Sequence, residues 1–201
     1  MSLELQQSAA DLRERFFALE TREAVANLLE IKYGHLMWCV YRVPLSQRYT
    51  HFSLPKKSGG NRTIMAPVST LKLVQRKLSQ VLSAVYKPKP SAHGFLRGRS
   101  IVTNARQHAG NKYVLNLDLK DFFPSINYGR VRGLLMGTPY KRKPGVATLL
   151  AAICCADNQL PQGAPTSPIV SNMICAKMDS QLQKLAEENR CFYTRYADDM
   201  T

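Results

Sequence analysis

Three aspartates are spaced so that they could act together in a basic protein. Asp118 lies within the alternating run YVLNLDLKDFF, and Asp198 and Asp199 follow the apolar run CFYTRYA. Strands disfavour acids, and successive strand residues point to opposite faces, so a turn must intervene if both acids of the pair serve one site. Three carboxylates from two adjacent strands would supply the hard oxygen ligands for two divalent cations, an arrangement that supports in-line phosphoryl transfer.

Each acidic feature also has an ordinary interpretation. Asp118 would fit a solvated strand face, and an isolated Asp-Asp pair would fit an exposed hairpin tip. A shared site is favoured because the three acids occur together in a chain whose formal charge is +14. Such a charge exceeds what solubility requires, and it suits a protein that neutralises nucleic-acid phosphates. An anionic membrane is a weaker expectation, because no expected helix combines a wide apolar face with a solidly basic one.

Composition excludes several other classes of protein. Apolar residues make up 45% and charged residues 21% of the chain, which is typical of a globular domain. The five cysteines are odd in number and lack a C-x-x-C pair, and the four histidines are scattered, so neither a disulfide framework nor a zinc site is expected. No stretch approaches the roughly 18 apolar residues of a membrane span, and the N-terminus lacks a signal-peptide core, so we expect a cytoplasmic protein without membrane contact.

The N-terminal half is expected to contain helices and one hairpin. Residues 8–33 predict two short helices, the second capped by Thr21. From Tyr49 to Ala66 two extended runs flank the segment KKSGG, which predicts a β-hairpin with a cationic, glycine-rich tip. Ser69 or Thr70 is expected to cap a long amphipathic helix. Its exposed face should carry the basic residues Lys72, Arg76 and Lys77.

The C-terminal half alternates strands with helices. Ser100 is expected to cap a short helix that runs through NARQH to a break at Gly110. A strand over Tyr113–Leu119 should send Leu115, Leu117 and Leu119 to the core and Asp118 to the opposite face. Later helices are expected near Tyr128–Met136, through Ala147–Cys155, and after Ser167 and Pro168 over Ile169–Asn189, with Met173, Ile174, Met178, Leu182 and Leu185 inward. A final strand, CFYTRY, completes an α+β pattern.

Three segments in order resemble a known family. LDLKDFFPSI, LPQGAPTSPIVSN and YADD look like the palm motifs of reverse transcriptases, and the resemblance extends from about Tyr49 to Thr201. It implies that Asp118 and Asp198 are the principal metal ligands and that Asp199 completes the acidic cluster. The implied cofactor is a pair of Mg²⁺ ions, for which Mn²⁺ is expected to substitute.

The same resemblance assigns nucleotide-binding roles. Phe123 would be the steric gate that rejects the 2′-hydroxyl of a ribonucleotide, and Gln162 and Gly163 would begin a loop against the template and the incoming base pair. Arg62, with Lys56 or Lys57, would bind the triphosphate of the incoming dNTP. Each assignment has an open alternative. Phe123 would fit a core phenylalanine, the loop of Gln162 and Gly163 would fit one that only caps the next helix, and the basic hairpin tip would fit solvated surface.

One short motif narrows the family. NARQH resembles the N-A-x-x-H signature of retron reverse transcriptases, whereas the neighbouring SAHGFLRGRSI is shared by many bacterial reverse transcriptases, including those of group II introns. RNA-binding residues are expected at Arg97, Arg99, Asn104 and His108. A helix end where His108 meets free carbonyls is the structural alternative.

The resemblance implies a right-hand polymerase fold with an antiparallel palm sheet packed on helices. We expect an N-terminal helical extension (1–48), fingers (49–110) and an incomplete palm (111–201), with the thumb absent. The implied activity is RNA-directed DNA synthesis on a structured noncoding RNA that serves as template and primer, giving RNA-linked DNA. Antiphage defence with a toxin or other effector protein is implied by retron membership alone. The alternatives are a group II intron maturase, another defence reverse transcriptase, or a truncated RNA-binding scaffold that is inactive alone.

Overall fold

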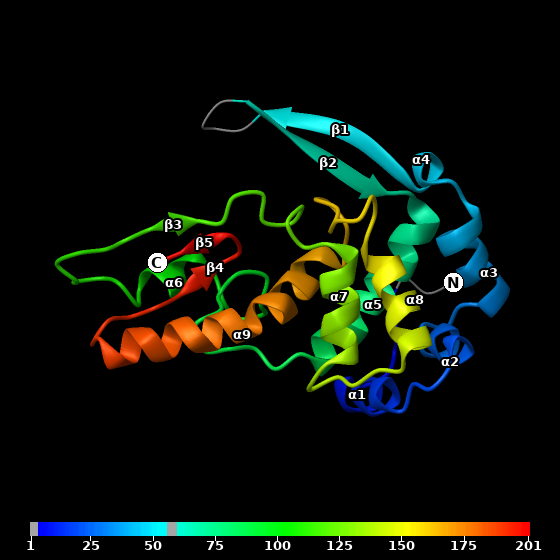
Figure 1. Cartoon of the computed structure of the whole chain (residues 1–201), viewed down its shortest axis with the longest axis horizontal. Coiled ribbons are helices and arrows are strands. Elements are labelled where there is room, and N and C mark those ends of the chain that lie inside the picture. The colour runs from blue at the N-terminus through cyan, green and yellow to red at the C-terminus, as the bar shows by residue number, and fades with distance from the viewer. Residues whose placement is uncertain (1–3, 56–59) are drawn as a thin grey trace. The chain divides into compact units, whose positions relative to one another are not determined.

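The computed structural model describes residues 4–55 and 60–201, and it divides into two compact units (Figure 1). The first unit contains the described residues up to Val85 together with Phe123–Val170. The second contains Tyr86–Phe122 and Ser171–Thr201. Compactness therefore divides the chain differently from the three functional domains that the sequence suggests, and those domain boundaries stay a prediction.

Helices form most of the first unit. They are α1 (Ala9–Phe17), α2 (Arg22–Leu28), α3 (Tyr33–Met37), a π-helical stretch (Trp38–Arg42), α4 (Leu45–Arg48), α5 (Ser69–Val85), α7 (Tyr128–Met136) and α8 (Pro144–Cys154). Contacts join α1 to α5 and α7 to α8, so apolar stripes meet in the interior. The prediction of α1, α2, α5, α7 and α8 is confirmed, although α8 begins three residues earlier than expected. The short helices between Tyr33 and Arg48 were not predicted, because segments of four or five residues are too short to show a periodic pattern.

Local capping fixes where the first helices begin. The Ser8 side chain accepts a hydrogen bond from the Asp11 backbone N–H at 3.1 Å. The Thr21 hydroxyl accepts one from Ala24 at 3.2 Å, which confirms the predicted cap of α2. Each cap satisfies a backbone donor that the helix itself leaves unpaired.

A long antiparallel hairpin also belongs to the first unit. Strands β1 (Tyr49–Pro55) and β2 (Asn61–Pro67) pair from Tyr49 opposite Pro67 to Pro55 opposite Asn61. Figure 1 shows them as two long arrows. The predicted hairpin is confirmed, and its tip, including Lys56 and Lys57, lies outside the described residues.

Lys77 contradicts the expected exposed face of α5. The side chain is buried, and its Nζ lies 3.5 Å from Oε2 of Glu30, whose side chain is 42% exposed. The helical pattern assigned Lys77 to the exposed face, but the pattern could not show that the packing of α5 would cover this position and supply a carboxylate.

The second unit contains α6 (Ile101–Ala105), most of α9 (Ser167–Glu188), and a small antiparallel sheet. Its strands are β3 (Leu117–Asp118), β4 (Arg195–Tyr196) and β5 (Asp199–Met200), in the order β3-β5-β4. Ser100 caps α6 and forms a capping box with Thr103, which confirms that prediction, although α6 ends at Ala105, before the end of NARQH. The mixed helices and antiparallel sheets agree with the α+β class; the assignment to fingers and palm stays a prediction.

The predicted strand over Tyr113–Leu119 is wrong in length and in orientation. Only Leu117 and Asp118 form ladder pairs, and the side chains of Leu115 and Leu117 are 70% and 50% exposed. Leu185 of α9, predicted to face inward, is 55% exposed. Alternation and helical periodicity show which residues share a face, but they do not show whether another element covers that face.

No helix in the described ranges is both long and apolar enough to cross a lipid bilayer.

Candidate active site

The small sheet of the second unit brings the three aspartates together. Asp118 of β3 is paired directly with Asp199 of β5 in the antiparallel register. The Leu119 N–H donates to the carbonyl of Asp198 at 3.0 Å, so Asp198 lies at the same end of the sheet. Because directly opposed residues of an antiparallel pair project from the same face, Asp118 and Asp199 share a face. The expectation that the strand of Asp118 and the C-terminal hairpin lie side by side is confirmed.

The electrostatics of this acidic group fit a site for cations. Partial burial, together with the negative charges of Asp198 and Asp118, raises the pKa of Asp199 above its ordinary value. Within the described ranges, however, no three His, Cys, Asp or Glu side chains are arranged so that they could hold a metal ion. Mg²⁺ usually takes only one or two protein carboxylates and fills its remaining positions with water and substrate phosphates. The donor chemistry of the three aspartates therefore fits such an ion, although the structure shows no complete cage.

The turn between β4 and β5 presents the acid pair. Tyr196 pairs with Asp199, so Ala197 and Asp198 form a two-residue connection. Ala197 has a φ of +59°, a left-handed conformation that is uncommon for residues other than glycine. A conformation of this kind persists only where surrounding contacts hold it.

A buried arginine supplies one of these contacts. Nη1 of Arg195 donates to the carbonyl of Ala197 at 2.8 Å. The other guanidinium nitrogens, Nε and Nη2, donate to the two carboxylate oxygens of Asp179, each at 2.8 Å, and Nη2 also donates to Oδ1 of Asn172 at 3.0 Å. The side chains of Arg195 and Asp179 are both fully buried. Burial by itself would lower the pKa of Arg195, but the hydrogen bond and charge of Asp179 outweigh burial and raise it.

Sequence reasoning missed this ion pair. Asn172 and Asp179 are seven residues apart on α9 and therefore lie on one face, which the apolar pattern assigned to packing alone. A polar pair at that spacing, followed by an arginine next to the acidic turn, is the signal that would have indicated it. Tyr193 completes the group, because its hydroxyl donates to Oδ1 of Asp179 at 3.0 Å.

A loop lies beside β4 and brings its backbone close to the turn. The Arg195 N–H donates to the carbonyl of Ser91, and the His93 N–H donates to the carbonyl of Arg195, both at 2.8 Å. A Cβ at Gly94 would lie 2.4 Å from the backbone nitrogen of Ala197, closer than a real Cβ approaches. Glycine is therefore required at position 94 for this approach.

Four described candidate residues for nucleotide binding lie in the first unit. Arg62 is exposed on β2, and Phe123 is half-buried. The carbonyl of Gln162 accepts the N–H of Met65 at 2.9 Å. Gly163 has a φ of +123°, and a Cβ there would lie 2.9 Å from Cγ2 of Ile64. The Gln162–Gly163 loop is thus attached to β2, the strand that carries Arg62; the nucleotide-binding roles stay predictions.

The residues predicted to bind RNA lie in the second unit and differ in exposure. Arg97 is exposed, whereas Arg99 donates through Nη1 to the carbonyls of Lys89, Pro90 and Ala92. Nε2 of His108 lies 2.6 Å from Oγ1 of Thr194, so His108 meets a hydroxyl group instead of free helix carbonyls. Oδ1 of Asn104 is buried and has no hydrogen-bond partner in the described part of the chain.

Comparison with known proteins agrees with the motif order. Residues 54–201 match the family model described as reverse transcriptase (RNA-dependent DNA polymerase). The chain belongs to this family. The match includes the three aspartates, β2, and the segments 86–110 and 162–166 that surround the candidate residues.

Several curated relatives are reverse transcriptases of retrons. The retron Mx162 reverse transcriptase of Myxococcus xanthus is 39% identical over 206 residues, covering 91% of this chain and 41% of the relative. The retron Mx65 enzyme of the same organism is 39% identical, with coverage of 90% and 47%. The retron Ec86 reverse transcriptase of Escherichia coli is 39% identical over 156 residues, covering 77% and 48%. The chain thus spans somewhat less than half the length of these relatives.

Proposed function

We propose that this chain forms the catalytic part of a retron RNA-directed DNA polymerase. The observation that carries the proposal is the direct pairing of Asp118 with Asp199, beside a turn that holds Asp198, in a chain of the reverse transcriptase family. In the proposed reaction the 3′-oxygen of a primer attacks the α-phosphorus of a dNTP. The bond to the β-phosphate bridging oxygen breaks, pyrophosphate leaves, and the hydroxyl proton passes to solvent.

The acidic group would hold divalent cations in this reaction. Asp118, Asp198 and Asp199 would bind two Mg²⁺ ions, with Mn²⁺ as a substitute. When bound, such ions stabilise the charge on the attacking and leaving oxygens. The buried Arg195 donates to the Ala197 carbonyl and is paired with Asp179, so these two residues would position the turn that carries the acids.

Residues of the first unit would bind the incoming nucleotide. Arg62, with Lys56 or Lys57, would contact the triphosphate, because a guanidinium group matches phosphate oxygens in charge and geometry. Phe123 would exclude the 2′-hydroxyl of a ribonucleotide. Gln162 and Gly163 would lie against the template and the new base pair.

The proposed template and primer is a structured noncoding RNA. Arg97, Arg99, Asn104 and His108 would contribute to its binding, and the formal charge of +14 suits a phosphate-rich partner. The proposed product is DNA linked to that RNA. A role in antiphage defence with an effector protein, in the cytoplasm, is part of the same proposal; the defence role and the effector are implied by retron membership alone.

The test is RNA-templated dNTP incorporation by the complete gene product that contains this chain. Asp118→Asn and Asp198→Asn should each lower the rate by about 10²–10³-fold, the usual cost of removing a single stabilising group. Asp157→Asn is the matched control, because Asp157 is exposed and its positive φ of +48° also suits asparagine. Retention of magnesium-dependent incorporation by Asp198→Asn would overturn the site assignment.

An intron-encoded reverse transcriptase is the second candidate function. A relative described as an uncharacterized 91 kDa protein in a cob intron of Schizosaccharomyces pombe is 29% identical over 153 residues. When no DNA primer is supplied, a retron enzyme should start synthesis only on the structured RNA encoded beside its own gene, whereas an intron enzyme should require its intron RNA. Exchanging the two RNAs in a primer-extension assay separates the candidates.

A further inference from the structure

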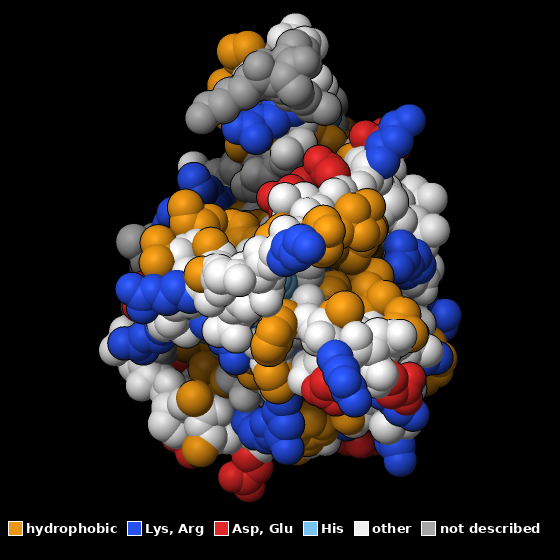
Figure 2. All heavy atoms as spheres, turned by 90° about the vertical axis from the view of Figure 1, so that its left-hand side faces the viewer, with side chains coloured by type: hydrophobic (Ala, Val, Ile, Leu, Met, Phe, Trp, Pro, Cys, Tyr) orange, Lys and Arg blue, Asp and Glu red, His pale blue; other side chains and the backbone are white. Residues whose placement is uncertain are grey.

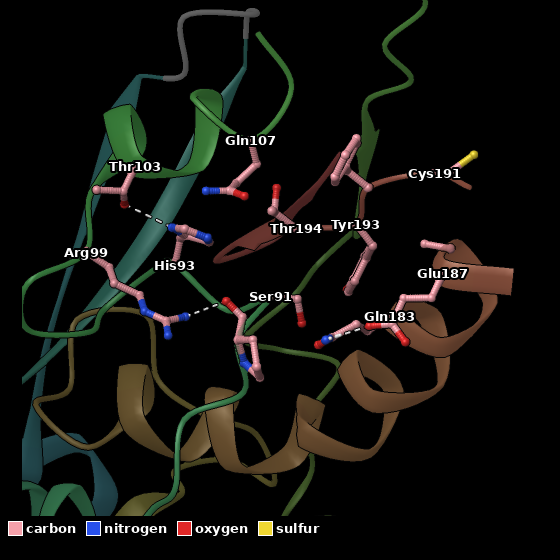
Figure 3. Close-up of a pocket in the computed structure, with 13 residues that line it drawn as sticks. Ser91, His93, Arg99, Thr103, Gln107, Gln183, Glu187, Cys191, Tyr193 and Thr194 are labelled. Carbon is pink, nitrogen blue, oxygen red and sulfur yellow. Dashed lines mark hydrogen bonds between the residues drawn. The ribbon is translucent and has the colours of Figure 1, made fainter. Parts of the chain in front are cut away.

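A polar pocket of about 410 Å³ lies in the second unit, apart from the acidic group. Its walls come from the loop before α6, from α6 and the turn after it, from the C-terminal part of α9, and from residues 191–194. Figure 3 shows Ser91, Gln107 and Thr194 around a common hollow, with Gln183 and Glu187 on α9 along another side. The volume lies within the range of about 300–1,000 Å³ that is typical of small-ligand sites.

The inner wall carries neutral polar groups. Ser91 is only 4% exposed, and its hydroxyl group finds no hydrogen-bond partner among the described residues. Nδ1 of His93 lies 2.9 Å from Oγ1 of Thr103. Burial, together with the nearby Arg99 and His108, lowers the pKa of His93 and so favours its neutral form. An unpaired buried hydroxyl group costs free energy unless a ligand satisfies it, which points to a hydrogen-bonding occupant.

The pocket is poorly suited to a phosphate group. Its one arginine, Arg99, uses Nη1 to bind backbone carbonyls of the same loop. The carboxylate of Glu187, which accepts a hydrogen bond from Gln183 at 3.1 Å, adds a negative charge to the wall. A carboxylate and amide groups are instead the side chains that read the edges of nucleobases, where the carboxylate accepts a hydrogen bond from an exocyclic amino group.

The rim of the pocket offers aromatic and cationic contacts. Phe192 and Tyr193 line it, and Phe192 is 62% exposed. Aromatic side chains of this kind stack on the unpaired bases of loops and bulges in RNA. Residues 87–112, which supply much of the wall, contain six Lys or Arg and no Asp or Glu, so the phosphates that flank a bound base would meet positive charge. Figure 2 views the side of the molecule that carries β3 and α6, and it shows Lys and Arg side chains interspersed with hydrophobic ones.

We propose that this pocket binds one unpaired base of the RNA, with the base stacked against Phe192 and its edge read by Glu187, Gln183 and Gln107. The proposal rests on the proposed RNA-directed activity and extends it to base recognition. Bases with an exocyclic amino group, adenine and cytosine among them, are favoured over uracil, since uracil offers Glu187 only a ring N–H.

The pocket lies beside the strands that present the acidic pair. Thr194 lines the pocket, and its backbone exchanges hydrogen bonds with Thr201 at 3.0 and 2.9 Å, immediately beside β4 and β5. A base held in the pocket would therefore fix the RNA at a set distance from Asp198 and Asp199.

The experiment measures the dissociation constants of fluorescein-labelled RNA hairpins that share one stem and carry loops of four A, four C or four U residues. Phe192→Ala should weaken binding of the A and C loops by about 5- to 150-fold, the range expected for loss of one stacked base. Leu185→Ala, an exposed apolar residue outside the pocket, is the matched control and should bind like the unmodified protein. Glu187→Gln should reduce the preference for A and C over U, whereas Glu188→Gln makes the same charge change at the next position and should keep it.

A second measurement uses the protein without substitution. Cys191 lies at the pocket and is exposed, whereas the other four cysteines are buried. Binding of the A-loop hairpin should slow alkylation of Cys191 by iodoacetamide by at least about fivefold, the fold-change that corresponds to roughly 1 kcal/mol of protection. The U-loop hairpin at the same concentration should protect less.

The outcomes separate this inference from the proposed function. Incorporation of dTTP on poly(rA)–oligo(dT), which supplies its own DNA primer and has no hairpin loop, measures nucleotide addition. If incorporation occurs but the hairpins bind Phe192→Ala and Leu185→Ala equally, or the unmodified protein does not distinguish the loops, the pocket proposal is overturned while the polymerase stands. If the pocket variants change loop binding in a protein that incorporates no dNTP, the pocket proposal holds and the proposed function fails.

Discussion

The interiors of the two units are filled by different kinds of side chain. In the first unit the fully buried residues are mainly apolar, such as Phe16, Leu78 and Leu149. In the second unit a large share of the buried residues is polar: Ser91, His93, Ser171, Asn172, Asp179, Thr194 and Arg195. Apolar burial is non-directional and tolerates small shifts, whereas buried polar groups must keep their partners in fixed directions. The unit that carries the acidic group is thus held by directional bonds, which suit a turn that must present carboxylates in one geometry.

The largest expected difference between the units is in the loss of stability when the buried cation of each is removed. Arg195→Met leaves the fully buried Asp179 without its cationic partner and should lower the free energy of unfolding by about 3–5 kcal/mol. Lys77→Met in the first unit should cost less than about 1 kcal/mol, because Glu30 is 42% exposed and water solvates its carboxylate. Urea denaturation of both variants measures the difference.

A double variant keeps this prediction testable if Arg195→Met does not fold. Arg195→Met combined with Asp179→Leu removes both charges and should recover a large part of the lost stability, since apolar replacements of buried ion pairs are often close to neutral. Equal losses in Arg195→Met and Lys77→Met would show that the two interiors do not differ in the way proposed.

Glycine positions give an intermediate effect. Gly94→Ala places a Cβ 2.4 Å from the backbone nitrogen of Ala197, and it should destabilise the protein by about 1–3 kcal/mol, as overpacking does. It should also reduce dNTP incorporation, because the strain acts on the acidic turn. Gly34→Ala in α3 is the control: apart from its chain neighbours and the backbone of its own helix, no described atom lies within 4 Å of its Cβ, and a stabilisation of up to about 1 kcal/mol is expected in a helix. Melting temperatures and incorporation rates of the two variants test the contrast.

The smallest expected effect concerns the pH dependence of stability. The pKa of Asp199 is raised in the folded protein, so its ionisation costs more there than in the unfolded chain. Stability therefore falls as pH rises from below the ordinary value of 3.8 through the raised pKa, and it stays reduced above that pKa. Asp199→Asn removes this loss and should stabilise the protein at pH 7 by less than about 1 kcal/mol, with no gain at acid pH.

Added Mg²⁺ should make the unsubstituted protein more stable than Asp199→Asn at pH 7. The ion binds the folded form of the unsubstituted protein and should raise its melting temperature more than that of Asp199→Asn. Asp157→Asn, tested in parallel, should match the unsubstituted protein both in its stability at each pH and in its response to Mg²⁺. If Asp199→Asn is less stable than the unsubstituted protein at every pH, the assigned repulsion among the three acids is contradicted.

The sequence predicts features that depend on local chemistry or on a strong motif. Thr21 and Ser100 cap their helices as expected, since capping needs only a side chain and the next turn. The pairing of Asp118 with the C-terminal hairpin followed from motif order. Burial and partners were harder to predict: the pair Arg195–Asp179 is 16 residues apart in the chain, and Lys77 is paired with a residue 47 positions away. Periodicity carries no information on such tertiary partners, and it equally failed for Leu115 and Leu185, which are exposed.

The exposed segment before Asp118 has a consequence for handling the protein. β3 is at the edge of its sheet, and Tyr113 and Leu115 of the adjoining segment are 82% and 70% exposed. A sheet edge flanked by exposed apolar residues tends to pair with the same edge of another copy, and the formal charge of +14 opposes such self-association. Salt shortens the range of that repulsion from about 10 Å at 0.1 M to about 3 Å at 1 M. Concentrated solutions should therefore become more prone to aggregate as the ionic strength rises. Leu115→Lys should reduce this aggregation.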